Sequence, residues 1–202
     1  MPFFVILFDR TSQIRHKMAD EKIDEPIVEV LTCERATDWP LVYDMARATQ
    51  GKLPIHKMPT DSWKRKMIFA PHSSIRGLQF FIQVKCPYYV QGHITRHHEG
   101  ITFCCGSQRN DRQDKYDRRA ARQDTPVIMG MLINGDAIKF VSRRRLCNKA
   151  DPATRAVWKA IVDAIGKIDP IVVEACKPEC WWNGGRCFEP IPCNKNNVKG
   201  EE

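Results

Sequence analysis

The sequence predicts a single α+β domain, because it contains a strand pattern and a helix pattern with no internal repeat or clear domain boundary between them. Apolar residues occupy every second position of 78–86, which is the period of a strand with one apolar face. Residues 154–168 instead carry one helical stripe of apolar side chains, formed by Val157, Ile161, Ala164, Ile165 and Ile168. Hydrophobic residues make up 43% of the chain and charged residues 28%, which excludes a disordered or a membrane protein.

The segments before residue 70 predict one strand and two helices. β-branched residues indicate a strand at 27–33. Asp38 is a suitable cap for a helix through 39–49, because its side chain can accept a hydrogen bond from a free amide of the first turn. A second helix is expected over 60–69, again opened by Thr or Asp.

The later segments predict mostly helices. Pro87 cannot continue a central strand but suits the first turn of a helix, which would run from Tyr88 to about His97. Residues 109–122 carry arginines spaced mostly by three or four with interleaved aspartates, as on a basic helix with internal ion pairs. Two further helices are expected, at 136–146 and 154–168.

The domain is expected to span residues 26–175, between an N-terminal extension at 1–25 and a cysteine-containing tail at 176–202. The apolar run at 2–8 is too short to cross a bilayer and lacks the features of a secretion signal. Nine cysteines, an odd number with two of them adjacent, favour a reducing compartment. We therefore expect a cytoplasmic protein.

The net charge of +8 favours a phosphorylated or polyanionic partner, although a charge of this size also serves solubility alone. Chemistry-bearing residues gather in "HITRHHEGITFCCGSQR", residues 93–109. His93 and His97 are spaced as zinc ligands on a helix, but Ile94 stands where a zinc hydrolase has Glu. Ser107 lacks the glycine-flanked elbow of a hydrolase.

Two interpretations of this stretch involve the binding of phosphate groups. The arginines could neutralise a nucleic-acid backbone, but no known nucleic-acid-binding signature accompanies them. Alternatively, the stretch forms a nucleotide pocket. Arginine provides a planar fork of donors, histidine exchanges protons near neutrality, and Ser after Gly can complete a phosphate cradle.

The sequence resembles the flavin-dependent thymidylate synthases in four blocks that follow the family's order. "FIQVKCPYYVQGHITRHH" resembles the strand, proline and helix that lead into the family's Arg-His-Arg motif. "TFCCGSQRN" and "INGDAIKFVSRRRLCNKADPATR" resemble the next two blocks. The tail "CKPECWWNGGRCFEPIPC" is similar to the cysteine-containing end of some members. The likeness runs from about residue 27 to residue 193.

This resemblance implies an α+β fold with a mixed or antiparallel sheet and flanking helices, assembled as a homotetramer with active sites between subunits. It implies FAD as cofactor, reduced by NADPH, and transfer of a one-carbon unit from methylenetetrahydrofolate to carbon 5 of dUMP, which gives dTMP. A uridine nucleotide is then the partner, and neither a membrane nor nucleic acid is expected.

The resemblance also implies the site residues. Arg145 would grip the uracil ring and stabilise the negative charge that develops on it. Ser107 and Arg109 match the residues that hold the nucleotide phosphate, with Gln108 between them, and His93 replaces a Gln that reaches the substrate. The flavin and folate side would be formed by Thr49, His72, Arg96, His97, His98, Asn134 and Phe140.

Several residues depart from the family pattern. His98 stands for the third Arg of the motif, and Arg76-Gly77 stand for a Glu-His pair that includes an FAD-binding histidine. Asp136 replaces a residue that is often Arg or Gln. Because these changes lie on the flavin and folate side, two alternatives stay open. One is a relative that methylates or hydroxymethylates another uridylate such as UMP, and the other is a non-enzymatic, regulatory or nucleic-acid-binding relative.

The cysteines allow two further interpretations. Cys105, of the pair that replaces the family's Asn-Glu, could attack carbon 6 of uracil as a thiolate, or the pair could be small fillers. The tail cysteines could bind a structural zinc or remain free thiols; they are Cys176, Cys180, Cys187 and Cys193. Trp181 and Trp182 are expected to serve packing or oligomer contacts.

Overall fold

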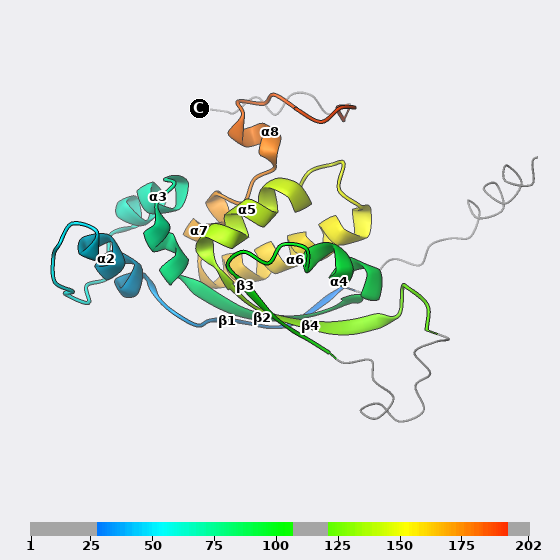
Figure 1. Cartoon of the computed structure of the whole chain (residues 1–202), viewed down its shortest axis with the longest axis horizontal. Coiled ribbons are helices and arrows are strands. Elements are labelled where there is room, and N and C mark those ends of the chain that lie inside the picture. The colour runs from blue at the N-terminus through cyan, green and yellow to red at the C-terminus, as the bar shows by residue number, and fades with distance from the viewer. Residues whose placement is uncertain (1–27, 107–120, 194–202) are drawn as a thin grey trace, which may run out of the picture.

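The computed structural model describes residues 28–106 and 121–193 of the chain. These residues form a four-stranded antiparallel sheet with helices gathered on one of its faces (Figure 1), which confirms the predicted α+β class. The strand order is β1-β2-β4-β3. The strands are β1 Glu29–Arg35, β2 Gln79–Pro87, β3 Ile101–Cys105 and β4 Pro126–Asn134.

The alternation seen in the sequence places β2 correctly. Its apolar positions are completely buried, namely Phe80, Ile82, Val84 and Cys86, while the residues between them are half-buried. β3 and β4 were not predicted. β4 reads "PVIMGMLIN", and its burial alternates apart from Gly130, but its outer face carries the apolar Ile128 and Leu132, so the sequence shows no alternation of apolar and polar residues.

The helices lie close to the predicted ranges. They are α2 Trp39–Ala48, α3 Asp61–Phe69, α4 Tyr88–Ile94, α5 Gly135–Arg145, α6 Pro152–Ile168, α7 Pro170–Glu174 and α8 Glu179–Trp182, with a 3-10 helix η1 at Ser73–Gly77. Asp38 accepts a hydrogen bond from the Trp39 amide at 2.7 Å, and the Thr60 side chain caps α3 in the same way. No helix in the described ranges is long and apolar enough to cross a membrane.

The predictions for three parts of the chain need correction or concern residues outside the described ranges. α4 ends at Ile94 rather than near His97, because Thr95 forms its cap and the chain then turns toward Gly100. The tail, for which the sequence analysis expects no helix, contains the short helix α8. Most of the predicted basic helix at 109–122 and all of the extension at 1–25 lie outside the described residues, and Arg122 is not helical.

The core is the layer between α6 and the sheet. Val157, Trp158, Ile161 and Ile165 of α6 are completely buried. The Trp158 indole Nε1 donates to Ser142 Oγ at 2.9 Å, which ties α6 to α5 and satisfies both buried polar groups. This contact holds α5, whose residues line the site described below, against the core.

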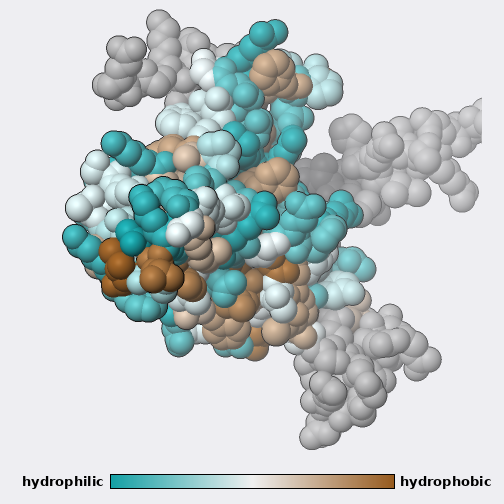
Figure 2. Space-filling model, turned by 60° about the vertical axis from the view of Figure 1, so that its left-hand side comes forward, coloured by the Kyte–Doolittle hydropathy of each residue, from teal (hydrophilic) through white to brown (hydrophobic). Residues whose placement is uncertain are grey.

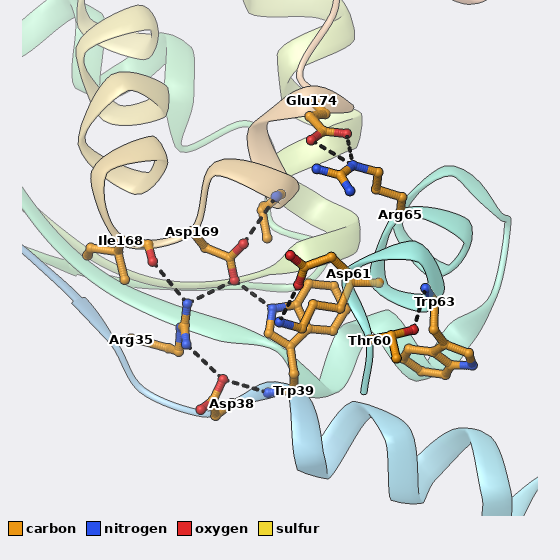
Figure 3. Close-up of polar contacts among 12 residues, drawn as sticks. Arg35, Asp38, Trp39, Thr60, Asp61, Trp63, Arg65, Ile168, Asp169 and Glu174 are labelled. Carbon is orange, nitrogen blue, oxygen red and sulfur yellow. Dashed lines mark hydrogen bonds and ion pairs between the residues drawn. The ribbon is translucent and has the colours of Figure 1, made fainter. Parts of the chain in front are cut away.

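A buried carboxylate joins the other end of α6 to β1 and α2. Asp169, 3% exposed, accepts hydrogen bonds from Trp39 Nε1 at 2.6 Å and from an Arg35 guanidinium nitrogen at 2.9 Å (Figure 3). Arg35 also donates to Asp38 at 2.8 Å and to the Ile168 carbonyl at 3.1 Å. The charge of Asp169 is therefore paired and hydrogen-bonded, as a buried charge must be.

Candidate functional site

Arg145, the last residue of α5, binds the end of α4. Its Nε donates to Nε2 of His97 at 2.9 Å, and a terminal nitrogen donates to the carbonyl oxygen of His93. The guanidinium thus satisfies a carbonyl in the last turn of α4, which has no partner within the helix. The structure brings together three of the predicted site residues, and we call Arg145, His93 and His97 the arginine cluster.

His97 is held neutral by this arrangement. Nε2 accepts the hydrogen bond from Arg145, so the ring carries its proton on Nδ1. Burial lowers the pKa of His97, and the positive charges of Arg145, Arg144 and His98 lower it further. The His93/His97 pair, considered for a metal and disfavoured in the sequence analysis, is divided here: the His97 ring contacts the guanidinium and the His93 ring contacts Thr154. Among the described residues no three His, Cys, Asp or Glu side chains are grouped as metal ligands.

His93 is positioned by a second chain of hydrogen bonds. Its Nδ1 lies 2.8 Å from the Thr154 hydroxyl, which donates to Oδ2 of Asp151 at 2.9 Å. Because the hydroxyl hydrogen points to the carboxylate, His93 Nδ1 must be the donor to Thr154. The neutral His93 ring then keeps Nε2 as an acceptor. Asp151 and Thr154 start α6, and Thr154 is completely buried.

A cavity of about 750 Å³ lies beside the arginine cluster. One face of α5 and the loop after α4 form much of its wall, and its lining includes Arg76, Glu99, Gly100, Asn134, Asp136, Lys139, Phe140, Arg143 and Trp182. Phe140, 51% exposed, packs edge-on against His97 with ring centroids 6.3 Å apart. Phe140 therefore links the cavity to the arginine cluster, although none of the three cluster residues lines the cavity itself.

Asn134 shapes the start of α5 in this cavity. Its Oδ1 accepts from the Ala137 amide at 2.9 Å as a helix cap. Gly100 lies against the Asn134 side chain in the left-handed region, with φ +73°, and an added Cβ would lie 2.5 Å from Asn134 Nδ2. Glycine is required at residue 100 on both counts.

The tail supplies another wall of the cavity. The Arg143 guanidinium stacks over the Trp182 ring at 4.6 Å from its centroid, and Nε of Arg143 lies 3.7 Å from Glu179. That Nε atom is buried and has no hydrogen-bond partner in the described part of the chain. Phe69 of α3 packs on Trp182, with ring centroids 5.7 Å apart. These contacts agree with the packing role expected for Trp182 and also place it in the site.

Two of the departures from the family pattern contact each other. Arg76 Nε lies 3.3 Å from Asp136 Oδ2, although the two residues are sixty positions apart. Lys139 also pairs with Asp136, at 3.4 Å. In this chain the two departing positions therefore form an ion pair with each other.

The remaining predicted cofactor residues lie around the site or away from it. His72 Nδ1 caps η1 by accepting from the Ser74 amide. Arg96 and His98 are exposed on the loop after α4. Thr49 is the cap at the far end of α2, where its hydroxyl donates to the Ala46 carbonyl at 2.8 Å, and it does not line the cavity.

The phosphate residues and the cysteine nucleophile remain predictions. Ser107, Gln108 and Arg109 lie outside the described residues. Cys105 ends β3 and is exposed. Partial desolvation and the neighbouring Cys104 raise its pKa, whereas a nucleophilic thiolate needs a lowered one. The described surroundings of Cys105 therefore do not activate it.

Sequence reasoning missed Thr154, Asp151, Lys139 and Arg143. Thr154 and His93 lie sixty-one positions apart, so no local spacing relates them. A signal for α5 did exist, because Asp136, Lys139, Phe140 and Arg143 follow at helical spacing and share one face.

Comparisons with known proteins agree with this architecture. Two solved structures of the UMP/dUMP methylase PolB from Streptomyces cacaoi, bound with 5-Br dUMP and with 5-Br UMP, superimpose with TM-scores of 0.57 and 0.50. The fold of this chain is similar to that of a UMP/dUMP methylase. The match covers 75% of this chain and 94% and 93% of the two PolB chains, at 13% identity. No protein-family model and no curated protein matches the sequence.

Proposed function

We propose that this protein methylates carbon 5 of a uridine nucleotide. The observation that carries the proposal is the arginine cluster: an arginine, matched by the resemblance to the uracil-gripping residue, is held by two ring-bearing residues beside a large cavity. The fold shared with a UMP/dUMP methylase supports it. The cavity lining carries three cations, Arg76, Lys139 and Arg143, against the two carboxylates Glu99 and Asp136, and the excess of positive charge suits anionic ligands.

In the proposed reaction, the methylene carbon of methylenetetrahydrofolate forms a bond to carbon 5 and its bonds to the folate nitrogens break, which releases tetrahydrofolate, while the hydrogen of carbon 5 leaves as a proton. NADPH supplies the two electrons that turn the methylene into a methyl group. Arg145 would donate to a uracil carbonyl oxygen and stabilise the negative charge that builds on the ring. Neutral His97 would hold the guanidinium in place without repelling it, because its Nε2 is an acceptor.

FAD is the cofactor that the resemblance implies, and the cavity walls suit it. Phe69, Phe140 and Trp182 offer apolar faces for a planar ring, while Lys139 and Arg143 offer cations for phosphates. The buried Nε of Arg143 makes no hydrogen bond within the described residues, although its ion-pair partner Glu179 lies 3.7 Å away, and a bound anionic group would accept one from it. When bound, FAD would carry the hydride between NADPH and the one-carbon unit.

The substrate is proposed to be dUMP or UMP. The PolB structures were obtained with the 5-bromo derivatives of both nucleotides, and PolB is named a methylase of both. A hydroxymethyl product would result if the one-carbon unit were captured by water in place of hydride. Product analysis by mass spectrometry separates the two outcomes.

The homotetramer is likewise a proposal. Large apolar side chains are exposed on α2 and the loop after it, in a region that Figure 2 turns toward the viewer: Leu41, Met45, Leu53, Ile55 and Met58. Exposed apolar patches of this kind commonly mark protein interfaces. Assembly would cover them and could complete a site between subunits.

The test starts with the absorbance spectrum of the purified chain, with and without added FAD, followed by titration with dUMP and UMP. A flavin spectrum that responds to one nucleotide supports the proposal and identifies the sugar. Release of tritium from carbon 5 of that nucleotide, dependent on methylenetetrahydrofolate and NADPH, tests the reaction. A colourless protein that binds DNA with steep salt dependence would instead favour the regulatory alternative.

A further inference from the structure

Four of the nine cysteines line one small cavity that the proposed reaction does not use. The cavity has a volume of about 220 Å³ and shares Arg143 with the larger one. Its cysteines come from three separate places, the loop after α5, α8, and the tail that follows: Cys147, Cys180, Cys187 and Cys193. All four are partly exposed and none is in a disulfide.

The backbone between Cys180 and Cys187 is folded to bring them together. Gly184 and Gly185 adopt φ values of +63° and +85°, which other residues rarely reach. The Gly185 amide donates to the Cys180 carbonyl at 2.8 Å, so the chain reverses directly after α8. Cys147 and Cys187 both lie close enough to Cys180 to raise its pKa, after the larger effect of burial.

Hydrogen-bond donors and cations surround the sulfurs. The Lys149 amide donates to Cys147 Sγ at 3.5 Å, and Asn148 Nδ2 lies 4.0 Å from Cys193 Sγ. Arg155 orients Asn148 by donating to its Oδ1 at 3.1 Å. Arg143 and Arg144 line the same cavity. N–H donors and nearby positive charge are what a cluster of thiolates around a metal requires, since they disperse its negative charge.

We propose that one structural Zn²⁺ is bound by four thiolates, from Cys147, Cys180, Cys187 and Cys193. Zinc accepts four sulfur ligands in a tetrahedron at about 2.3 Å, and a closed set of four leaves no position for substrate. In the described residues these sulfurs line one cavity but do not converge as a ligand group, so metal binding would require them to move toward one another.

The structure changes which cysteines could form the zinc site considered in the sequence analysis. Cys176 is 5% exposed, its thiol donates to the Val172 carbonyl at 3.8 Å, and burial raises its pKa to about 11. It belongs to the core. Cys147 takes its place in the set and comes from a segment that tail spacing alone could not include.

The metal would hold the tail against α5. Cys180 lies in α8, two residues before Trp182, and Trp182 stacks on Arg143 and forms a wall of the larger cavity. Zinc would therefore fix the position of that wall. Its loss is expected to weaken ligand binding in the larger cavity without removing any residue from it.

The first test is metal analysis of the full-length chain purified with reductant, and we expect about one zinc per chain. Substitution Cys147→Ser or Cys187→Ser should lower the zinc content at least severalfold. The matched control is Cys104→Ser, which changes an exposed cysteine outside this cavity and should leave zinc unchanged. Equal zinc in all three variants would overturn the assignment.

A second measurement keeps the test valid if the variants fail to fold. The metal-free, reduced wild-type chain is titrated with Co²⁺, and we expect the intense sulfur-to-metal absorption and visible bands of a tetrahedral thiolate site, displaced by Zn²⁺. Absence of these bands in a folded, fully reduced chain would overturn the proposal. So would mass-spectrometric detection of a disulfide among these cysteines together with no zinc under reducing conditions. Neither outcome depends on nucleotide or flavin binding.

Discussion

Arg145 and His97 form a directed contact, in which Nε of the arginine donates to Nε2 of the histidine at 2.9 Å. The two residues are forty-eight positions apart and come from the end of α5 and the loop after α4. The contact fixes the plane of the guanidinium and the tautomer of the ring at the same time. It therefore leads to separate predictions for each partner.

Replacing Arg145 with lysine should weaken nucleotide binding although the charge is kept. The guanidinium is a fixed fork of donors that can bind His97, the His93 carbonyl and a uracil oxygen at the same time. A lysine ammonium is a single point of charge and cannot make all three contacts. Loss of a charged hydrogen bond of about 1.5–3 kcal/mol corresponds to roughly a 10- to 100-fold rise in Kd. Calorimetric titration with dUMP or UMP measures it. Arg144→Lys, at the exposed neighbour, is the control, and equal affinities in both variants would contradict the role of Arg145.

His97 should titrate below the ordinary histidine value of 6.5, because burial and nearby cations lower its pKa. The unfolded chain then binds a proton more readily than the folded one, so stability rises with pH between the lowered pKa and about 6.5 and is lost as pH falls through that window. Urea unfolding at pH 7.5 and 5.5 tests this. His97→Gln keeps an acceptor for Arg145 but cannot titrate, and it should reduce the pH dependence. An unchanged pH dependence would show that His97 is not responsible.

Thr154 is expected to set the tautomer of His93 through its hydroxyl group. Thr154→Val removes the acceptor of His93 Nδ1–H, so the ring should populate the other tautomer, detected by nitrogen-15 NMR of the histidine ring. Nucleotide affinity should fall by about threefold to tenfold, which is the effect of one hydrogen bond. Thr154→Ser keeps the hydroxyl and should restore both readouts. If the valine variant keeps the wild-type NMR signals, the hydroxyl does not control the ring.

The part of the fold that the sequence predicted is the part controlled by local patterns. Apolar and polar residues alternate along β2 because α6 covers one of its faces. Helices α2 and α6 begin at the aspartate caps Asp38 and Asp151, and the cap at Asp38 was predicted from the sequence. β4 escaped prediction because its less buried face also carries apolar residues, Ile128 and Leu132, so its sequence does not alternate although its burial does. α4 ends earlier than predicted because the chain turns after Thr95 toward Gly100. The Gly100 carbonyl accepts a hydrogen bond from the Asn134 amide, a contact made across the fold.

The candidate site was predicted only in part for a related reason. Arg145, His93, Asn134 and Phe140 were named through resemblance, and they do gather around one cavity and one cluster. Their supporting partners come from segments about sixty residues away, as Thr154 does for His93. Such pairings depend on how α6 packs against α4, and the spacing of residues along the chain does not reveal that packing.

Exchanging the charges of Arg76 and Asp136 should test whether their ion pair belongs to the site. Arg76→Glu alone or Asp136→Arg alone places like charges 3.3 Å apart and should disturb the cavity wall. Both changes together restore attraction with the two charges exchanged. We expect FAD affinity, followed by fluorescence quenching, to fall in each single variant and to recover in the double variant. Purely additive losses would show that the two residues act independently.

Asp169 should be the most sensitive carboxylate of the fold described here. Asp169→Ala leaves the Arg35 guanidinium and the Trp39 indole N–H without their shared partner in the interior. Breaking a buried pair in this way costs about 3–5 kcal/mol, to be read from the free energy of unfolding in urea. Asp163→Ala is the matched control, because its pair with Lys159 is exposed and should contribute less than about 1 kcal/mol. Since Asp169 lies outside the cavity lining, the nucleotide affinity of the remaining folded protein should stay unchanged, which separates loss of stability from loss of the site.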